Sequence, residues 1–157
     1  MIHKSHNLKI AKTLALSTVL GISLANGANA AEALTVNLQA KQVVTENGKQ
    51  VLKAVSRANK GDVIQYQATY RNNLQKPMTN VALTIPVPAS MVYVSSSSPA
   101  PIQASLDGKK FENLPIMRKV NGKMVEVPAS QYRAVRWIVK TLPAQQSATV
   151  SINTKVQ

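Results

Sequence analysis

The sequence of 157 residues contains no cysteine, and its two histidines, His3 and His6, both lie at the amino terminus. Beyond that terminus the chain offers neither an imidazole nor a thiol, and Ser-His-Asp and Cys-His catalysis both need an imidazole base. Zinc sites depend on the same residue types, and no glycine-rich phosphate-binding loop occurs either. These absences exclude the common nucleophilic hydrolases, zinc centres and disulfide bonds.

The chain also lacks a long hydrophobic run. Its longest, residues 13–25, has thirteen residues, whereas a membrane-spanning helix needs about 18 or more. Three lysines precede this run, and Ala-Asn-Ala follows it at residues 28–30. A basic start, a short apolar centre and small residues before the cleavage point are typical of a secretory signal peptide. We therefore predict a signal peptide over residues 1–30 and one exported domain over residues 31–157, without a transmembrane segment, periplasmic or secreted from a bacterium.

Acidic residues are scarce. Six of them stand against 19 Lys and Arg, which gives a formal net charge of +13, and loss of the three lysines of the signal peptide lowers it to +10. A positive field of this size favours anionic partners such as acidic polysaccharides, lipid headgroups or nucleic acid. The carboxylates are scattered, so no pair marks a glycosidase and no acidic loop marks a calcium site. We expect no enzyme, no cofactor and no metal site.

No sustained helical period follows the signal peptide, where apolar and polar residues alternate with a period of two instead. Residues 63–71, 80–88 and 147–156 show the alternation most clearly, and a β-strand with one buried face produces it. Pro86 and Pro88 take outward positions, which predicts that their strand is an edge strand or ends there. Many short strands separated by Asn-Gly or Asp-Gly turns indicate an all-β sandwich or barrel. Shorter or weaker strand candidates lie at residues 34–43, 49–55, 91–94, 102–106 and 124–127.

The only tryptophan, Trp137, lies among basic residues near the carboxyl end. Val135, Trp137 and Val139 share one parity of the alternation, and Arg136 and Lys140 take the other. Surfaces that bind nucleic acid expose aromatic rings beside their charges, so that bases stack on the rings. Since the ring and the charges fall on opposite faces here, we predict a buried Trp137 and expect no nucleic-acid partner.

Residues 99–130 are the least regular part of the chain, and we interpret them as an excursion that carries a hairpin. This excursion contains a local cluster of positive charge. The cluster is a candidate contact surface for an acidic polymer, and the alternative is a loop that is merely solvated. The candidate residues are Lys109, Lys110, Arg118, Lys119 and Lys123.

An ordered series of short motifs runs through residues 60–98 and 135–156. The series consists of Gly61-Asp62, Tyr70 to Asn73, Asn80-Val81, Pro88-Ala89, Tyr93 to Ser95, Trp137, Leu142-Pro143 and Ser147 to Thr149. This order resembles the conserved-repeat domain of bacterial surface and envelope proteins, a domain of unknown function. The resemblance implies an immunoglobulin-like antiparallel β-sandwich, here of about seven to nine strands, and it brings no catalytic residues. Where that family has glycine in the last turn, this chain has Gln145-Gln146, so we expect a turn of a different type.

These observations predict an exported, non-catalytic envelope protein. The first hypothesis for its function is a protein–protein interaction or structural module whose loops or edge strand contact another envelope protein, for example by strand addition. The second hypothesis is a polyanion binder that uses the basic cluster on acidic polysaccharide or lipid headgroups, or on nucleic acid, which the predicted burial of Trp137 disfavours. Binding of the second kind weakens steeply with salt.

Overall fold

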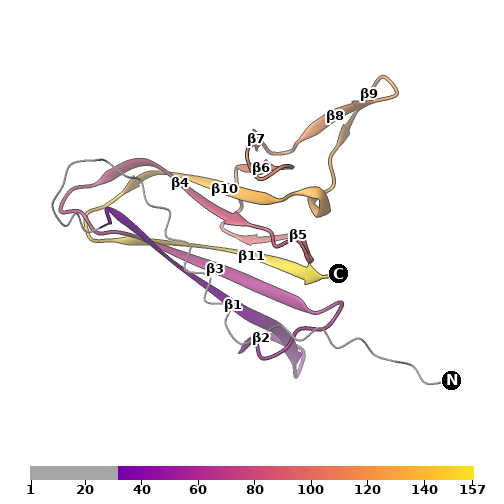
Figure 1. The fold of residues 1–157 in the computed structure, drawn as a ribbon, viewed down its shortest axis with the longest axis horizontal. Coiled ribbons are helices and arrows are strands. Elements are labelled where there is room, and N and C mark those ends of the chain that lie inside the picture. The colour runs from indigo at the N-terminus through magenta and orange to yellow at the C-terminus, as the bar shows by residue number, and fades with distance from the viewer. Residues whose placement is uncertain (1–31) are drawn as a thin grey trace.

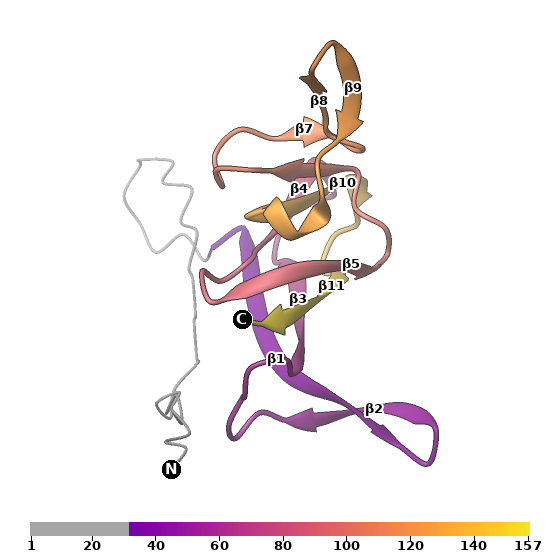
Figure 2. The same ribbon diagram turned by 90° about the vertical axis from the view of Figure 1, so that its right-hand side faces the viewer.

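The computed structural model describes residues 32–157, so the predicted signal peptide lies outside the described residues. Two antiparallel sheets face each other there, as Figure 1 and Figure 2 show. The first has the order β2 (Lys49–Ala54), β1 (Leu34–Glu46), β3 (Val63–Asn72), β11 (Ser147–Val156), β5 (Met91–Ser98). The second has the order β4 (Met78–Pro86), β10 (Ala134–Leu142), β6 (Gln103–Ser105), β7 (Glu112–Asn113).

Two further strands, β8 (Met117–Val120) and β9 (Lys123–Glu126), pair only with each other, and a short 3₁₀ helix (Ala129–Gln131) leads from them into β10. The all-β sandwich that the sequence predicted is confirmed, and its architecture is compatible with the immunoglobulin-like class. The described residues contain eleven strands rather than seven to nine. The strands that no candidate covered are β7 and β8 of the irregular excursion, where two and four residues leave too little alternation to detect.

The core lies between the two sheets and follows the predicted alternation. On β3, Ile64, Tyr66 and Ala68 are buried, and the residues between them are only partly covered. Ile152 of β11 and Leu83 of β4 are both 0% exposed and belong to the same hydrophobic cluster. Burying a side chain of this size contributes about 1.5–3 kcal/mol, so the facing strands supply most of the driving force for folding.

Trp137 belongs to this core, as predicted. It is 4% exposed, and its indole Nε1 donates a hydrogen bond of 2.8 Å to the carbonyl oxygen of Pro99. The alternate residues of β10 face outward. Among them, Ile138 is exposed, and the guanidinium of Arg136 lies 3.4 Å from the ring centre of Phe111. Trp137 therefore ties the segment after β5 to the core and presents no ring to a ligand.

The edge strand β4 ends at Pro86 and pairs with β10 alone, which confirms the prediction from the prolines. Tyr70 reaches this strand from β3 across the sandwich. Its hydroxyl donates to the carbonyl oxygen of Thr84 at 2.6 Å and accepts from the Thr84 N–H at 2.9 Å. Both backbone groups of Thr84 thus have a partner, and Pro86 has no N–H to offer. At Thr84 and Pro86 the edge therefore offers no free N–H to an added strand.

The turn before β11 carries Gln145 where the resembling family has glycine. Gln145 has a φ of 57°, a left-handed conformation that glycine adopts most easily. Its side-chain Nε2 donates to the carbonyl oxygens of Asn73 at 2.7 Å and Leu74 at 3.2 Å. These two bonds offset the conformational cost, so the turn keeps a glycine-like backbone that the sequence did not lead us to expect.

Candidate functional site

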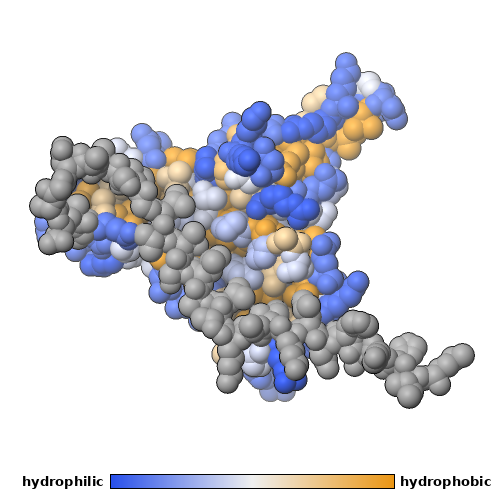
Figure 3. Space-filling view, in the orientation of Figure 1, coloured by the Kyte–Doolittle hydropathy of each residue, from blue (hydrophilic) through white to orange (hydrophobic). Residues whose placement is uncertain are grey.

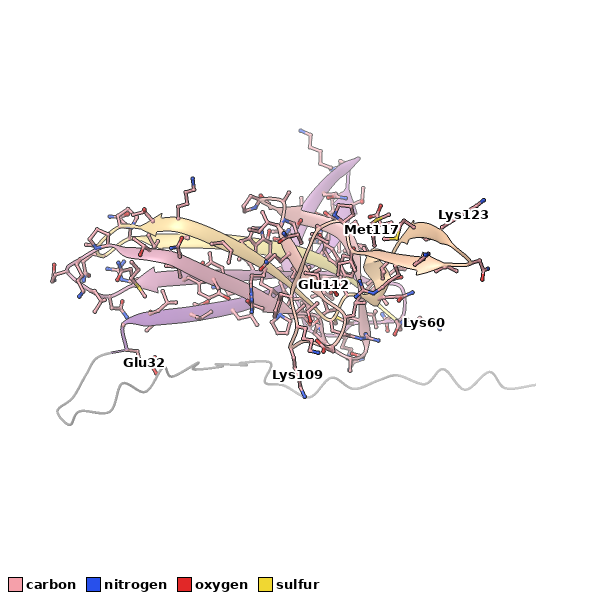
Figure 4. All side chains as sticks on the ribbon, turned by 90° about the horizontal axis from the view of Figure 1, so that it is seen from above. Glu32, Lys60, Lys109, Glu112, Met117 and Lys123 are labelled. Carbon is pink, nitrogen blue, oxygen red and sulfur yellow. The ribbon has the colours of Figure 1, made fainter. Side chains whose placement is uncertain are left out.

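The five candidate basic residues come from three elements. Lys109 and Lys110 lie in the loop between β6 and β7, Arg118 and Lys119 lie on β8, and Lys123 begins β9. Figure 4 shows that Lys109 points away from the sandwich in one direction, whereas Lys123 stands at the far end of the β8–β9 hairpin. The structure therefore does not gather the five residues into one contact surface.

Arg118 is held by a carboxylate of its own chain. Its Nη1 donates to Oε2 of Glu112 at 2.8 Å, and its Nη2 pairs with Oε1 of the same side chain. The hydrogen bond lowers the pKa of the Glu112 carboxyl and raises that of the Arg118 guanidinium. Because the pair neutralises both charges and ties β8 to β7, Arg118 serves to anchor the hairpin.

Asp107 organises the loop that carries Lys109 and Lys110. Its Oδ1 accepts hydrogen bonds from the backbone N–H groups of both lysines, each at 2.8 Å, and from Oγ of Ser105 at 2.9 Å. The bond from Lys110, followed by that from Lys109, is the main reason why the pKa of Asp107 falls to about 2. The carboxylate is therefore ionised beside the two lysines and offsets part of their charge.

The β8–β9 hairpin exposes an unusual amount of apolar surface. Met117 is 37% exposed, Val120 51%, Met124 61% and Val125 46%. These four are half of the eight large hydrophobic side chains that are exposed in residues 32–157. Figure 3 shows apolar and hydrophilic residues intermixed along the hairpin, which projects from the sandwich at the upper right. Sequence reasoning missed this surface, because residues 117–120 carry too few apolar residues to indicate a strand.

The register of the hairpin distributes these residues over both of its faces. Met117 pairs with Glu126 and Lys119 with Met124, which places those four side chains on one face. The other face carries Arg118, Val120, Lys123 and Val125. The turn between the strands, Asn121-Gly122, has positive φ at both residues, as a two-residue hairpin requires. Each face thus holds two apolar side chains and at least one basic one.

Lys119 and Lys123 have no carboxylate partner within residues 32–157, where the ion pairs are Lys53 with Glu46 and Arg118 with Glu112. Both lysines are exposed. Of the five predicted contact residues, these two combine free charge with neighbouring apolar surface. The candidate functional site is accordingly the hairpin from Met117 to Glu126, in which Lys119 and Lys123 accompany the four exposed apolar residues.

Comparison with protein-family models, with curated proteins and with solved structures finds no match to this chain. The resemblance to the conserved-repeat domain accordingly stays a prediction. Within the described part of the chain no three His, Cys, Asp or Glu side chains come together as possible metal ligands. Residues 32–157 also form no helix with the length and hydrophobicity of a membrane span.

Proposed function

We propose that this protein is an exported, non-catalytic binding module of the cell envelope, and that the β8–β9 hairpin is its contact element. One observation carries the proposal: four exposed apolar side chains and two lysines without ion-pair partners project together from an otherwise well-packed sandwich. Exposed apolar clusters of this kind on a folded domain mark interaction surfaces. The sandwich acts as a rigid support that holds the hairpin clear of the rest of the molecule (Figure 2).

The chemistry of the remaining residues supports a non-catalytic role. Of the carboxylates outside the hairpin, Asp107 and Glu112 lie closest to it along the chain, and both are engaged in hydrogen bonds that shape the backbone or anchor β8. A general acid or base needs a carboxyl that is free to meet a substrate and has a pKa near the working pH. The pKa values of Asp107 and Glu112 are instead shifted downward.

Photo-crosslinking in the expressing cell tests the proposal. A photoreactive amino acid in place of Met124 should give adducts with an envelope component, and the same group in place of Thr69, on the outer face of β3, should not. Changing Val120 and Val125 to Ser should reduce the adducts at position 124. Equal adducts at both positions, or adducts that survive the two serine substitutions, would contradict a contact through the hairpin.

Polyanion binding is a second candidate function, and the freedom of Lys119 and Lys123 favours it. It does not extend to all five basic residues, because Arg118 is paired and Lys109 and Lys110 lie elsewhere. This function predicts retention on an acidic polysaccharide column that falls steeply with salt. A double change of Lys119 and Lys123 to Gln should lower the eluting salt concentration more than the same change at Lys109 and Lys110.

A further inference from the structure

The hairpin has apolar side chains on both of its faces, and this distribution restricts the kind of partner that fits it. A flat protein surface would cover one face, for example Met117 and Met124, and would leave Val120 and Val125 in water. A medium that surrounds the hairpin removes all four side chains from water at once. Since hydrophobic stabilisation follows the apolar area that is buried, a surrounding medium gains about twice as many contacts as a flat surface.

The positions of the lysines indicate which medium this is. Lys119 faces the partner strand at Met124, and Lys123 at Val120, so each lysine lies beside an apolar residue and the two occupy opposite faces. A lysine can lay its aliphatic stem along apolar surface and keep its ammonium group in a polar layer. Segments that lie at the boundary between the headgroups and acyl chains of anionic lipids combine apolar side chains with lysines.

Negative charge is absent from the outer part of the hairpin. Glu126 lies opposite Met117 in the strand register, at the base of the hairpin, and Glu112 forms an ion pair with Arg118. The tip from Lys119 to Met124 therefore carries two positive charges and no carboxylate. The described residues hold all six acidic residues and the basic residues that remain without Lys4, Lys9 and Lys12, which gives the domain a formal charge of +10. Such a field attracts the domain to an anionic surface and holds it there.

The length of the hairpin also suits insertion into the boundary between headgroups and acyl chains. Each strand has four residues, which corresponds to about 13 Å at the rise of an extended chain. Interfacial segments bury their apolar groups about 5–10 Å into the boundary between headgroups and acyl chains. Inserted tip first, the hairpin is therefore long enough to carry its Met and Val side chains to the acyl chains, while the lysine stems extend back to the headgroup phosphates.

We infer that the partner of the β8–β9 hairpin is an anionic lipid surface, into which Val120, Met124 and Val125 insert while Lys119 and Lys123 bind the headgroup phosphates. This inference rests on the proposed function and names the class of partner for it. Its physical basis is the combination of two-sided apolar exposure with unpaired lysines at one projecting tip.

Vesicle flotation of the exported protein tests the inference. The vesicles consist of phosphatidylcholine alone or of equal parts of phosphatidylcholine and phosphatidylglycerol. The protein should float with the anionic vesicles and not with the neutral ones. A Lys119→Gln/Lys123→Gln variant should lose about 25-fold in binding, since each lysine near an anionic surface contributes about fivefold. A Val120→Ser/Met124→Ser variant should lose at least about tenfold, because two apolar side chains no longer insert. All variants share one amino terminus, so that differences report the hairpin alone.

A Lys109→Gln/Lys110→Gln variant is the matched control. It removes the same charge from the loop between β6 and β7 and should bind within about twofold of the unchanged protein. Insertion has a separate readout, because the chain has no cysteine. A polarity-sensitive dye on Met124→Cys should shift to the blue on anionic vesicles, and the same dye on Lys109→Cys should not.

The possible outcomes separate the inference from the proposed function. Absent vesicle binding, together with hairpin-dependent crosslinks to an envelope protein, overturns the lipid surface and keeps the binding module. Vesicle binding that is unchanged in both hairpin variants, or equally reduced in the Lys109/Lys110 control, shows that general charge suffices and also overturns the inference. If every hairpin variant keeps both its vesicle binding and its crosslinks, both proposals are wrong.

Discussion

Strand β3 and the β8–β9 hairpin are both β-structure, and they differ in what covers them. In β3 every second side chain from Ile64 to Asn72 is buried, because the strand lies between β1 and β11 and under the second sheet. In β8 and β9 every residue is exposed, because the two strands pair only with each other. The comparison shows that the number of neighbouring elements, more than the residue types, decides whether the side chains of a strand join the core or stay exposed.

An isolated two-stranded hairpin is marginally stable in water, so the flanks of this one have to hold it in place. Ile116 and Val127, directly before and after the hairpin, are both buried, and the Val127 N–H donates to the carbonyl oxygen of Ile116 at 2.8 Å. Tyr132 adds a bond from its hydroxyl to the carbonyl oxygen of Val127 at 3.2 Å. Together with the ion pair of Arg118, these contacts anchor the base of the hairpin and leave its tip uncovered.

The largest expected difference between the two regions concerns stability. Ile152→Ala empties a core position that is 0% exposed and should lower the free energy of unfolding by about 2–5 kcal/mol. Val125→Ala in the hairpin should change it by less than about 0.5 kcal/mol. Urea unfolding of both variants measures the two values. A comparable loss from Val125→Ala would show that the hairpin is part of the folding core.

The next effect concerns Asn72, a buried polar residue at the end of β3. Its Nδ2 donates to the carbonyl oxygens of Lys76, Leu142 and Pro143, at 2.9, 3.1 and 3.0 Å. Asn72→Ala should cost about 2–3 kcal/mol, because it leaves the buried carbonyl group of Leu142 and two partly buried ones without this donor. Asn113→Ala is the control, since the exposed Asn113 accepts its bond from Gln103 at the surface, and thermal unfolding should separate the two variants clearly.

A smaller effect should follow from Tyr70→Phe, which removes the two hydrogen bonds to Thr84 and should cost about 1–1.5 kcal/mol. Burial raises the pKa of Tyr70 above 10.0, against a smaller opposite effect of the hydrogen bond to Thr84. The folded state therefore keeps a proton that the unfolded state releases, and stability falls as the pH rises through 10 and beyond. The free energy of unfolding of the Tyr70→Phe variant should fall less steeply between neutral and strongly alkaline pH. An identical slope in both proteins would exclude Tyr70 as the group responsible.

The smallest effect is confined to the loop between β6 and β7. The pKa of Asp107 is lowered from 3.8 to about 2, so the stabilisation of the loop is complete above pH 3.8 and is lost as the pH falls toward 2. The protection of the Lys109 and Lys110 amides against hydrogen exchange, taken relative to the intrinsic exchange rate at each pH, should fall over this range. In Asp107→Asn the exchange should depend much less on acid, with little change in global stability. A measured pKa of Asp107 near the ordinary value of 3.8 would contradict the hydrogen bonds that its carboxylate accepts in this loop.

Several features of the fold could be read from the residues. The period of two predicted which side chains of β3, β4 and β10 face the core, among them Tyr70, Leu83 and Trp137, and all three are buried. Periodicity succeeds there because each strand is long enough to repeat the pattern several times. It failed at β8, where four residues with two adjacent cations hide a strand.

The candidate site could be read only in part. The sequence pointed to five basic residues, and tertiary structure removed Arg118 through its pair with Glu112 and separated Lys109 and Lys110 from Lys119 and Lys123. It also exposed four apolar side chains that composition alone cannot place. Ion pairs and exposure depend on residues that are distant in the chain or on neighbours that are missing, and a linear pattern contains neither.

The range of the forces explains which features the sequence specifies and which the tertiary structure decides. Alternation, turn residues and proline act within a few positions, so the order of residues alone specifies strands, tight turns and the inward parity of Trp137. Burial and charge pairing act between segments that meet only after folding, such as Tyr70 with Thr84 and Arg118 with Glu112. Packing in three dimensions therefore determines which strands form the core, and which pair is left uncovered.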